Sequence, residues 1–307
     1  MGYNPRMPWY RIAGQEIFFS CPASNLYLYK IADGNDVLTA PPPVSSSLAL
    51  TCQTVGWVGG EQREVETWSA SPGVLLKVAG GSDFYIAPRG RGILRVDGGE
   101  SDCPSSRTAQ SDLLDREILV GPALVLALAQ RGTWCLHASA ASFNGRLTAF
   151  LGESGQGKST LAEYLDTDGG PEWRRIADDI LPVTFDSSVV QVWPHFPQLK
   201  LSQMSQPGPG LPDHLPLDRI CVLSRAELDQ GPSLQLLSAR EAMQAVVSHT
   251  AGTRLFDPSL LAGHLAFCAG VARQVPVYKL AYPHRRDALP AVRKLLEAHR
   301  ESVTFQT

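Results

Sequence analysis

Residues 147–165 read LTAFLGESGQGKSTLAEYL, and the fold is best approached from this stretch. Its middle, GESGQGKS at residues 152–159, fits the pattern G-x-x-x-x-G-K-[S/T] at every defined position. An apolar run, residues 147–151, precedes the pattern, and a helix-forming run, residues 160–165, follows it. Glycines let backbone N–H groups converge on phosphate oxygens, and the following helix adds unpaired amides and the positive end of its dipole. The sequence therefore predicts a phosphate-binding loop between a strand and a helix.

The loop predicts a nucleoside triphosphate, ATP, as the ligand, together with Mg²⁺. We expect the nucleotide to contact Gly152, Glu153, Ser154, Gly155, Gln156, Gly157, Lys158, Ser159 and Thr160. Lys158 is expected to bridge the β and γ phosphates. Ser159 is expected to coordinate Mg²⁺, a hard cation that prefers oxygen ligands and phosphate.

Two adjacent carboxylates, Asp178 and Asp179, come twenty residues after the loop lysine, at the end of a predicted strand. One of them can hold Mg²⁺ or its waters, while the other accepts the proton of an attacking hydroxyl. Neighbours in a strand point to opposite faces, so both reach one metal only if the strand has ended there. The alternative is a solvated turn or a helix cap.

His137 lies in LHAS, on the predicted strand before the one that leads into the loop. Taken alone, a histidine among small apolar residues is more typical of a hydrogen-bonded core residue than of a catalytic group.

The elements around the loop predict a β-rich first half and an α/β second half. A polar segment, residues 98–112, separates them, so we predict an N-terminal domain over 1–110 and a catalytic domain over 111–307. Between residues 10 and 96 short β-type runs alternate with turns, and APPPVSSS at 40–47 is a predicted loop. The later strands are expected at 135–143, 147–151, 174–185, 189–193 and 275–282. The helices are expected at 113–130, with a kink at Gly121-Pro122, and at 239–249, 258–272 and 288–299, the last three capped by Ser238, Asp257 and Asp287.

Composition narrows the function classes. The 307 residues are 44% hydrophobic and 19% charged, as in ordinary globular proteins, and the net charge is −3. A weakly acidic chain creates no positive electrostatic potential that would attract nucleic acid or anionic lipid. The longest apolar stretch is too short to cross a bilayer. We therefore expect no nucleic-acid partner, no membrane association and a cytoplasmic location. The six cysteines show neither metal-ligand spacing nor a disulfide framework.

The order of these motifs resembles the catalytic domain of the HPr kinase/phosphorylase family. The resemblance rests on a histidine 21 residues before the loop lysine, on GESGQGKST and on the Ala-Asp-Asp strand end, and it covers residues 136–181. It implies an HPr-kinase-like P-loop domain behind a β-rich domain. It also implies that Asp179 deprotonates a serine hydroxyl, that Asp178 is its partner near the metal, and that His137 and Lys158 are catalytic groups around the phosphates.

The sequence also departs from that family. Residues 168–171 lengthen the segment between loop and acidic pair, and the family's later acidic metal ligand has no counterpart in residues 193–201. HPr as substrate and reverse phosphorylase activity are therefore not expected. The P-x-F-P-x-L-K-L segment at 194–201, VPVYKL at 275–280 and LHASA at 136–140 are similar to the HPr-kinase-like enzymes of lasso-peptide gene clusters. This similarity implies a peptide substrate, the C-terminal serine of a lasso-peptide precursor.

Two other function classes stay open: a regulatory P-loop ATPase and a small-molecule kinase. The sequence contains no LSGGQ-like run, which an ABC-type ATPase would carry. About half the chain precedes the loop, which leaves room for a peptide-binding domain that a small-molecule kinase would not need. The N-terminal domain is a candidate for that role. The sequence leaves the oligomeric state open, a homo-oligomer included.

Overall fold

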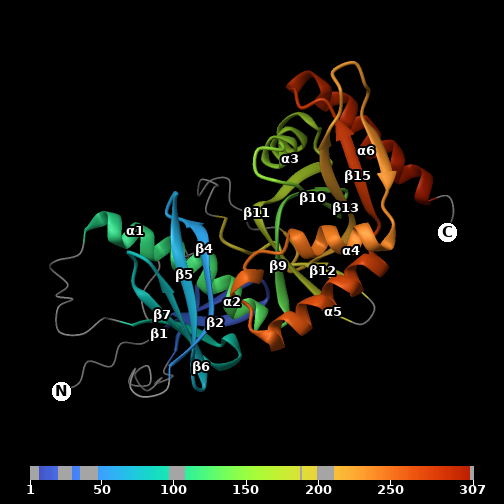
Figure 1. The fold of residues 1–307 in the computed structure, drawn as a ribbon. Helices are drawn as coiled ribbons and strands as arrows, with labels where there is room; N and C mark the ends of the chain where they lie inside the picture. Colours follow the sequence, from blue (N-terminus) through green and yellow to red (C-terminus); the bar gives the residue numbers. More distant parts are fainter. Residues whose placement is uncertain are drawn as a thin grey trace. The chain divides into compact units, whose positions relative to one another are not determined.

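The computed structural model describes residues 7–19, 30–34, 48–96, 108–186, 189–198 and 211–304. The predicted loop at 40–47, Cys21, Cys103, Ser187, Ser188 and the end of the P-x-F-P-x-L-K-L segment lie outside the described residues. The chain forms two compact units (Figure 1). Unit 1 is Met1–Cys135 with Gly252–Gly263, and unit 2 is Leu136–Ala251 with His264–Thr307.

Unit 1 is built on an eight-stranded sheet of order β3-β1-β2-β8-β7-β6-β5-β4. Neighbouring strands are antiparallel except for the parallel pair β2–β8. The predicted β-rich first half is therefore confirmed. The strands are β1 (Met7–Ile12), β2 (Gln15–Phe19), β3 (Lys30–Gly34), β4 (Ala49–Val58), β5 (Glu61–Ala70), β6 (Gly73–Val78), β7 (Asp83–Ile86) and β8 (Gly92–Val96).

The helix predicted over 113–130 is present, but it begins earlier and is interrupted. It consists of α1 (Ala109–Ile118), a π-helical turn η5 (Leu119–Ala123) and α2 (Leu124–Ala129). Thr108 begins α1 with a capping box, because its side chain accepts the N–H of Ser111 while the Ser111 hydroxyl accepts the N–H of Thr108. Gly121 leaves helical geometry at φ −89° and ψ −108° just before Pro122, so the predicted kink is confirmed.

This helix packs with the sheet of unit 1, and therefore the units divide at Cys135 rather than near residue 110 as the sequence predicted. The residues of α2 are buried all round, as expected for a helix that is apolar on every face. Asp115 accepts the N–H and the hydroxyl of Ser82, at 2.8 and 2.7 Å. The amide oxygen of Gln130 accepts the N–H of Gly90 at 2.9 Å.

Unit 2 is a mixed α/β unit with a seven-stranded sheet of order β10-β9-β11-β12-β13-β15-β14. An additional parallel pairing of β10 with β13 joins the first and fifth strands of that order, so these five strands form a closed ring of pairings. β13 also pairs in parallel with β15. The strands are β9 (Thr133–Phe143), β10 (Arg146–Leu151), β11 (Trp173–Asp186), β12 (Val189–Val192), β13 (Leu215–Arg225), β14 (Ser233–Leu236) and β15 (Val277–Tyr282).

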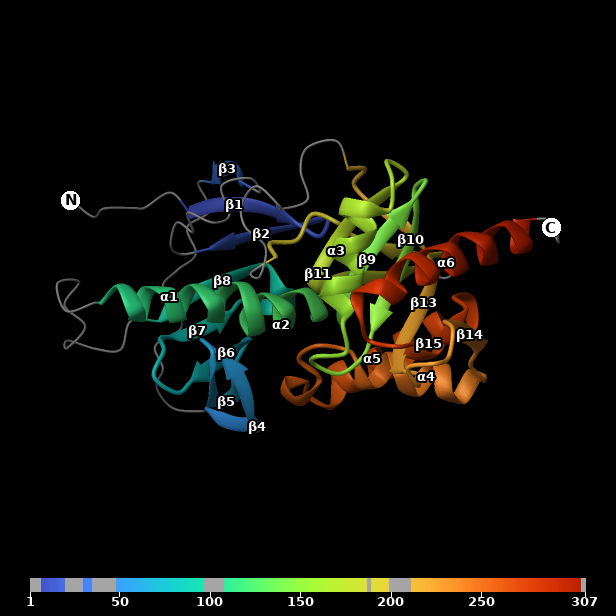
Figure 2. The same cartoon turned by 90° about the horizontal axis from the view of Figure 1, so that it is seen from above.

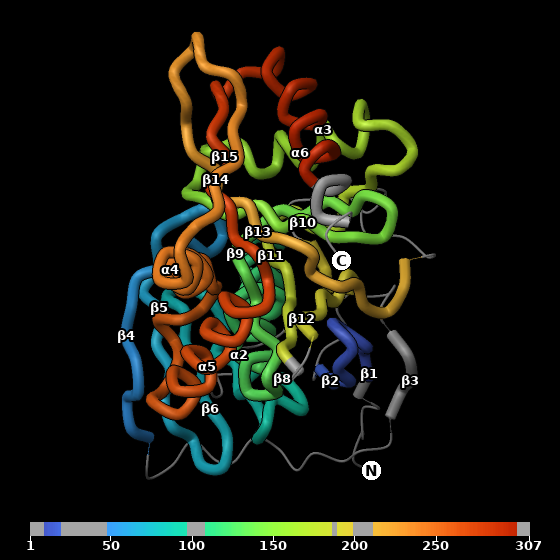
Figure 3. Tube along the Cα trace, turned by 90° about the vertical axis from the view of Figure 1, so that its right-hand side faces the viewer, coloured from blue at the N-terminus to red at the C-terminus, as the bar shows by residue number. Residues whose placement is uncertain are grey.

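Among the described residues, unit 2 also contains the helices α3 (Lys158–Asp168), α4 (Ala239–Ser248) and α6 (Leu289–Thr304). It contains most of α5 (Pro258–Gln274) as well, whose first residues, up to Gly263, belong to unit 1. α3 and α6 lie next to each other (Figure 3) and share a buried core with the central strands through Phe150, Leu161 and Leu296. α4 and α5 lie on the other side of the strands (Figure 2). Ser238 and Asp257 cap α4 and α5 as predicted. Asp287 does not cap α6, because it lies inside a 3₁₀ turn, and α6 begins at Leu289.

Among the described residues, Cys52, Cys135, Cys221 and Cys268 form no disulfide bond. Among the described residues, no helix combines the length and the apolar character that a membrane crossing needs.

Candidate functional site

The glycine loop connects β10 to α3, so the strand–loop–helix arrangement predicted from the sequence is confirmed. Gly155 and Gly157 have φ values of 82° and 84°, in the left-handed region that glycine adopts at little cost. Gly157 is the N-cap residue of α3. A Cβ added at Gly155 would meet no atom within 4 Å, so glycine is needed there for its backbone angle rather than for space.

Lys158 is the first residue of α3, and its side chain folds back over the loop. Its Nζ donates to the backbone oxygens of Gly152 and Glu153, at 2.7 and 3.2 Å, and the residue is 7% exposed. Ser159 and Thr160, in the same first turn, are exposed. The turn thus presents two hydroxyls and the first amides of an eleven-residue helix, an arrangement that suits an anion.

The side chains of the two aspartates of β11 contact residues of β9, the neighbouring strand in the sheet. The Ser139 hydroxyl donates to Asp178 Oδ1 at 2.9 Å, and Asp178 is 6% exposed. Asp179 Oδ1 lies 3.2 Å from Nδ1 of His137. His137 and Ser139 are two residues apart and so share one face of β9, which means that both aspartates turn to that face.

That shared direction corrects the expectation that the strand ends at the acidic pair. β11 continues to Asp186, well past the pair. The regularity is broken instead at Asp179, whose φ of 155° is unusual for a residue other than glycine. This local irregularity lets consecutive carboxylates serve one face of the sheet.

Gln198 is a buried support for the acidic pair that the sequence reasoning missed. Its Oε1 accepts the backbone N–H of Asp178 at 3.0 Å, and its Nε2 donates to the backbone oxygen of Ile180 at 2.8 Å. Gln198 is 3% exposed. One side chain therefore holds the backbone of β11 on both sides of Asp179.

The register of the hairpin brings the loop and the acidic pair to one level of the sheet. Phe150 of β10 pairs with Ser139 of β9, so Gly152, two residues on, comes level with His137. Neighbouring strands lie about 4.8 Å apart, so β10 and β11, on either side of β9, are separated by about 10 Å. The structure thus gathers the predicted loop, His137 and both aspartates at one level of three adjacent strands, beyond the end of β10 and within β9 and β11.

The side-chain oxygens of the candidate site are of the chemical type that Mg²⁺ prefers. The Ser159 hydroxyl and the Asp178 carboxylate are hard oxygen ligands. In the part of the chain that the structure describes, no group of three or more His, Cys, Asp or Glu side chains is placed to enclose a metal ion. Mg²⁺ commonly binds to one or two protein oxygens together with substrate phosphates, so this small donor set suits a metal held jointly with a nucleotide.

Tyr282, at the carboxyl end of β15, is a second residue that the sequence reasoning did not find. Its hydroxyl lies 3.2 Å from the position of a Cβ built on Gly157, so it borders the loop. Burial raises the pKa of Tyr282 to about 12, so the phenol is neutral at physiological pH. The signal available was its place at the end of a parallel strand, where ligands of α/β sheets commonly bind.

Comparisons with known proteins add little to this geometry. No protein-family model matches the chain, and no curated protein matches it. Among solved structures, it is similar to the Hpr(Ser) kinase/phosphatase from Coxiella burnetii, over 55% of this chain and 98% of that one, with a TM-score of 0.32 and 12% identity. A likeness this low carries no argument, so the assignment of the site rests on the residues described above.

Proposed function

We propose that this protein is an ATP-dependent serine kinase that transfers the γ-phosphoryl group to a hydroxyl of a peptide. The observation that carries the proposal is the register of three neighbouring strands. β10 leads into the glycine loop level with His137, and β11 places Asp179 3.2 Å from that histidine. A loop that suits phosphates, beside a pair of carboxylates, supplies the parts that phosphoryl transfer requires.

In the proposed reaction the loop amides and Lys158 hold the phosphates of ATP and position the γ-phosphorus. Mg²⁺, held by Ser159, Asp178 and phosphate oxygens, would neutralise the charge that develops on the phosphates. Asp179 accepts the proton of the substrate hydroxyl. The hydroxyl oxygen forms a bond to the γ-phosphorus while the bond to the bridging β–γ oxygen breaks, and ADP leaves. His137 orients the Asp179 carboxylate through their contact.

The finer proposal is that the acceptor is the C-terminal serine of a lasso-peptide precursor. It is supported by the similarity of LHASA, of the segment at 194–201 and of VPVYKL to the HPr-kinase-like enzymes of lasso-peptide clusters. Residues 136–140 and 277–280 of these segments lie in β9 and β15 of unit 2.

The test is intact-mass spectrometry of a peptide with a C-terminal serine after incubation with the protein, ATP and Mg²⁺. We expect the peptide to gain the mass of one phosphoryl group. Asp179→Asn should lower the rate by about a hundredfold or more, because a general base contributes on that scale, while nucleotide binding persists. Asp229→Asn, at an exposed acid elsewhere in unit 2, is the matched control and should leave the rate unchanged.

Each alternative has its own outcome in this assay. ADP release without any peptide product would show a P-loop ATPase. Phosphorylation of a small molecule but of no peptide would show a small-molecule kinase. An undiminished rate in Asp179→Asn would refute the assignment of the base.

A further inference from the structure

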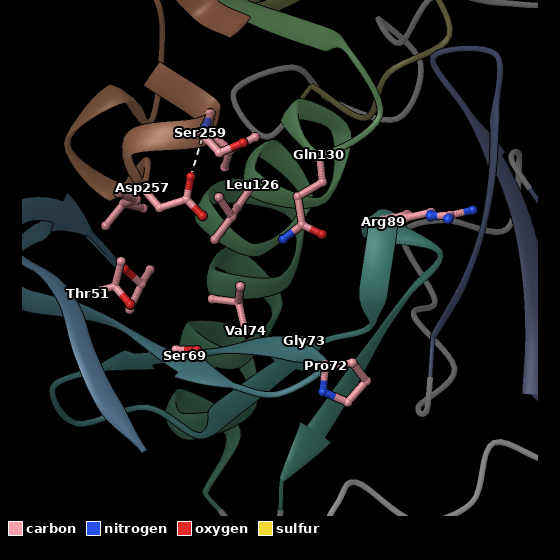
Figure 4. Close-up of a pocket in the computed structure, with 13 residues that line it drawn as sticks. Thr51, Ser69, Pro72, Gly73, Val74, Arg89, Leu126, Gln130, Asp257 and Ser259 are labelled. Atoms are coloured by element: carbon pink, nitrogen blue, oxygen red, sulfur yellow. Dashed lines mark hydrogen bonds between the residues drawn. The ribbon is translucent and has the colours of Figure 1, made fainter. Parts of the chain in front are cut away.

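Unit 1 contains a cavity of about 410 Å³ lined by residues of β4, β5, β6, α2 and the start of α5. Figure 4 shows the Asp257 carboxylate and the Gln130 amide turned toward the same space, while the Arg89 side chain points away from it. Arg89 and Asp257 are the charged residues that line the cavity, and of the two Asp257 turns its charged group toward it.

The polar groups around this cavity are not all used by the fold. Thr67 is 1% exposed, and its buried hydroxyl has no hydrogen-bond partner. Asp257 accepts the N–H of Leu260 with Oδ1 at 2.8 Å, which leaves its second oxygen as an acceptor. A carboxylate next to hydroxyl groups favours a cationic side chain that carries several N–H donors.

One wall of the cavity belongs to an edge strand. Thr51 of β4 lines the cavity, and among the described strands β4 pairs only with β5. β4 is ten residues long, and it exposes Val55 and Trp57, at 56% and 73%. A long exposed edge with unpaired backbone groups is the surface to which an extended peptide adds as a further strand.

Carboxylates also lie beside this edge, on the face of β5 opposite to Thr67. On β5, Glu66 pairs across the strands with Gln53 and Glu64 pairs with Val55. Both carboxylates accept hydrogen bonds from the neutral Gln53 amide. Glu66 also has Lys77 of β6 as its cross-strand neighbour, and Lys77 forms an ion pair with Asp83, so the carboxylates still outnumber the cation. The edge therefore complements a peptide with basic side chains.

We propose that unit 1 binds an extended basic peptide segment, which adds to β4 as a strand and places a Lys or Arg side chain in the cavity against Asp257. The inference rests on the proposed function in one respect, that this peptide is part of the phosphoryl acceptor. The backbone edge would supply affinity and the cavity would select the side chain.

The test is fluorescence anisotropy with the full chain, no nucleotide, and two labelled peptides, of four Lys-Thr repeats and of four Glu-Thr repeats. We expect the Lys-Thr peptide to bind and the Glu-Thr peptide not to bind. Trp57→Ala and Asp257→Asn should each weaken binding by about fivefold or more, and the asparagine keeps the cap acceptor of α5. Asp229→Asn removes an exposed charge in unit 2 and should change nothing.

Strand addition has a signature that charge attraction alone lacks. Two versions of the Lys-Thr peptide are N-methylated, one on the lysine amides and one on the threonine amides. Only the amides on one edge of the peptide bond to β4, so one version should lose binding and the other should keep it. Equal binding of the two versions, or of the Lys-Thr and Glu-Thr peptides, would overturn the inference. A protein that binds the peptide but phosphorylates nothing would instead overturn the proposed function.

Discussion

His264 and Cys268 form a buried polar pair one helical turn apart on α5. The Cys268 Sγ lies 3.1 Å from His264 Nε2, and the two residues are 0% and 2% exposed, respectively. Burial lowers the pKa of His264 and raises the pKa of Cys268 to about 12. Both groups are therefore neutral at physiological pH. A charge on either group would be costly, because the site is shielded from water.

Acid should weaken the fold through His264. Its folded pKa lies below the ordinary value of 6.5, so the unfolded chain binds the proton more readily. The stability from the neutral imidazole is complete above pH 6.5 and is lost as the pH falls from 6.5 toward the folded pKa. We expect the urea midpoint of the wild type to fall as the pH is lowered over this range. The midpoint of His264→Asn should fall less steeply. Identical slopes for the two proteins would contradict the prediction.

The contact of the η2 turn (Pro88–Gly90) with α2 leaves no room for a side chain. Gly90 has a φ of 62°, and a Cβ built there would lie 2.0 Å from the backbone oxygen of Ala127. The glycine thus sets how closely this turn approaches the helix of unit 1.

Gly90→Ala should lower the free energy of unfolding by about 2–5 kcal/mol, from left-handed backbone strain plus overpacking. Gly60→Ala is the matched control, because Gly60 has a φ of 74° but open space around it. It should cost only the strain, about 1–2 kcal/mol. Chemical denaturation measures the free energy of unfolding of both variants. Equal decreases would contradict the prediction, because they would mean that the added methyl group meets no steric penalty at Ala127.

Local signals in the sequence predicted the local elements well. Asn144-Gly145 makes the predicted hairpin with φ values of 49° and 78°, and Ser238 caps α4. β13 was not predicted, because Arg219 interrupts its apolar pattern. That arginine is 2% exposed, and it donates to the Thr148 hydroxyl and to the backbone oxygen of Leu296. Its partners lie some seventy residues away, where no local pattern reveals them, and its third nitrogen is buried without a hydrogen-bond partner.

The same distinction holds for the candidate site. The glycine loop is a contiguous motif, so it could be read directly from the sequence. Gln198 and Tyr282 reach the site only through folding, from the segment after β12 and from the end of β15. The turn of both aspartates to one face depends on the φ of Asp179, a backbone angle that no residue pattern encodes.

At the scale of the whole molecule, the glycine loop belongs to one of two compact units, each with its own sheet. Mg-ATP should therefore slow amide hydrogen exchange in β9, β10 and α3 and leave β4 to β8 unchanged. At a hundred times the dissociation constant the bound unit gains about 2.7 kcal/mol against opening. Adenosine, which lacks the phosphates, is the control and should protect the loop much less. Equal protection by adenosine would contradict phosphate binding at the loop.

The β9–β10 hairpin also limits where the chain can tolerate insertions. Residues added at the Asn144-Gly145 tip can loop out while Phe150 stays paired with Ser139, because the hydrogen bonds within the strands do not involve the tip. One residue added between Phe150 and Gly152 would displace the glycine loop relative to His137. A reporter peptide can therefore be grafted at the tip, while the strand interiors must keep a fixed number of residues.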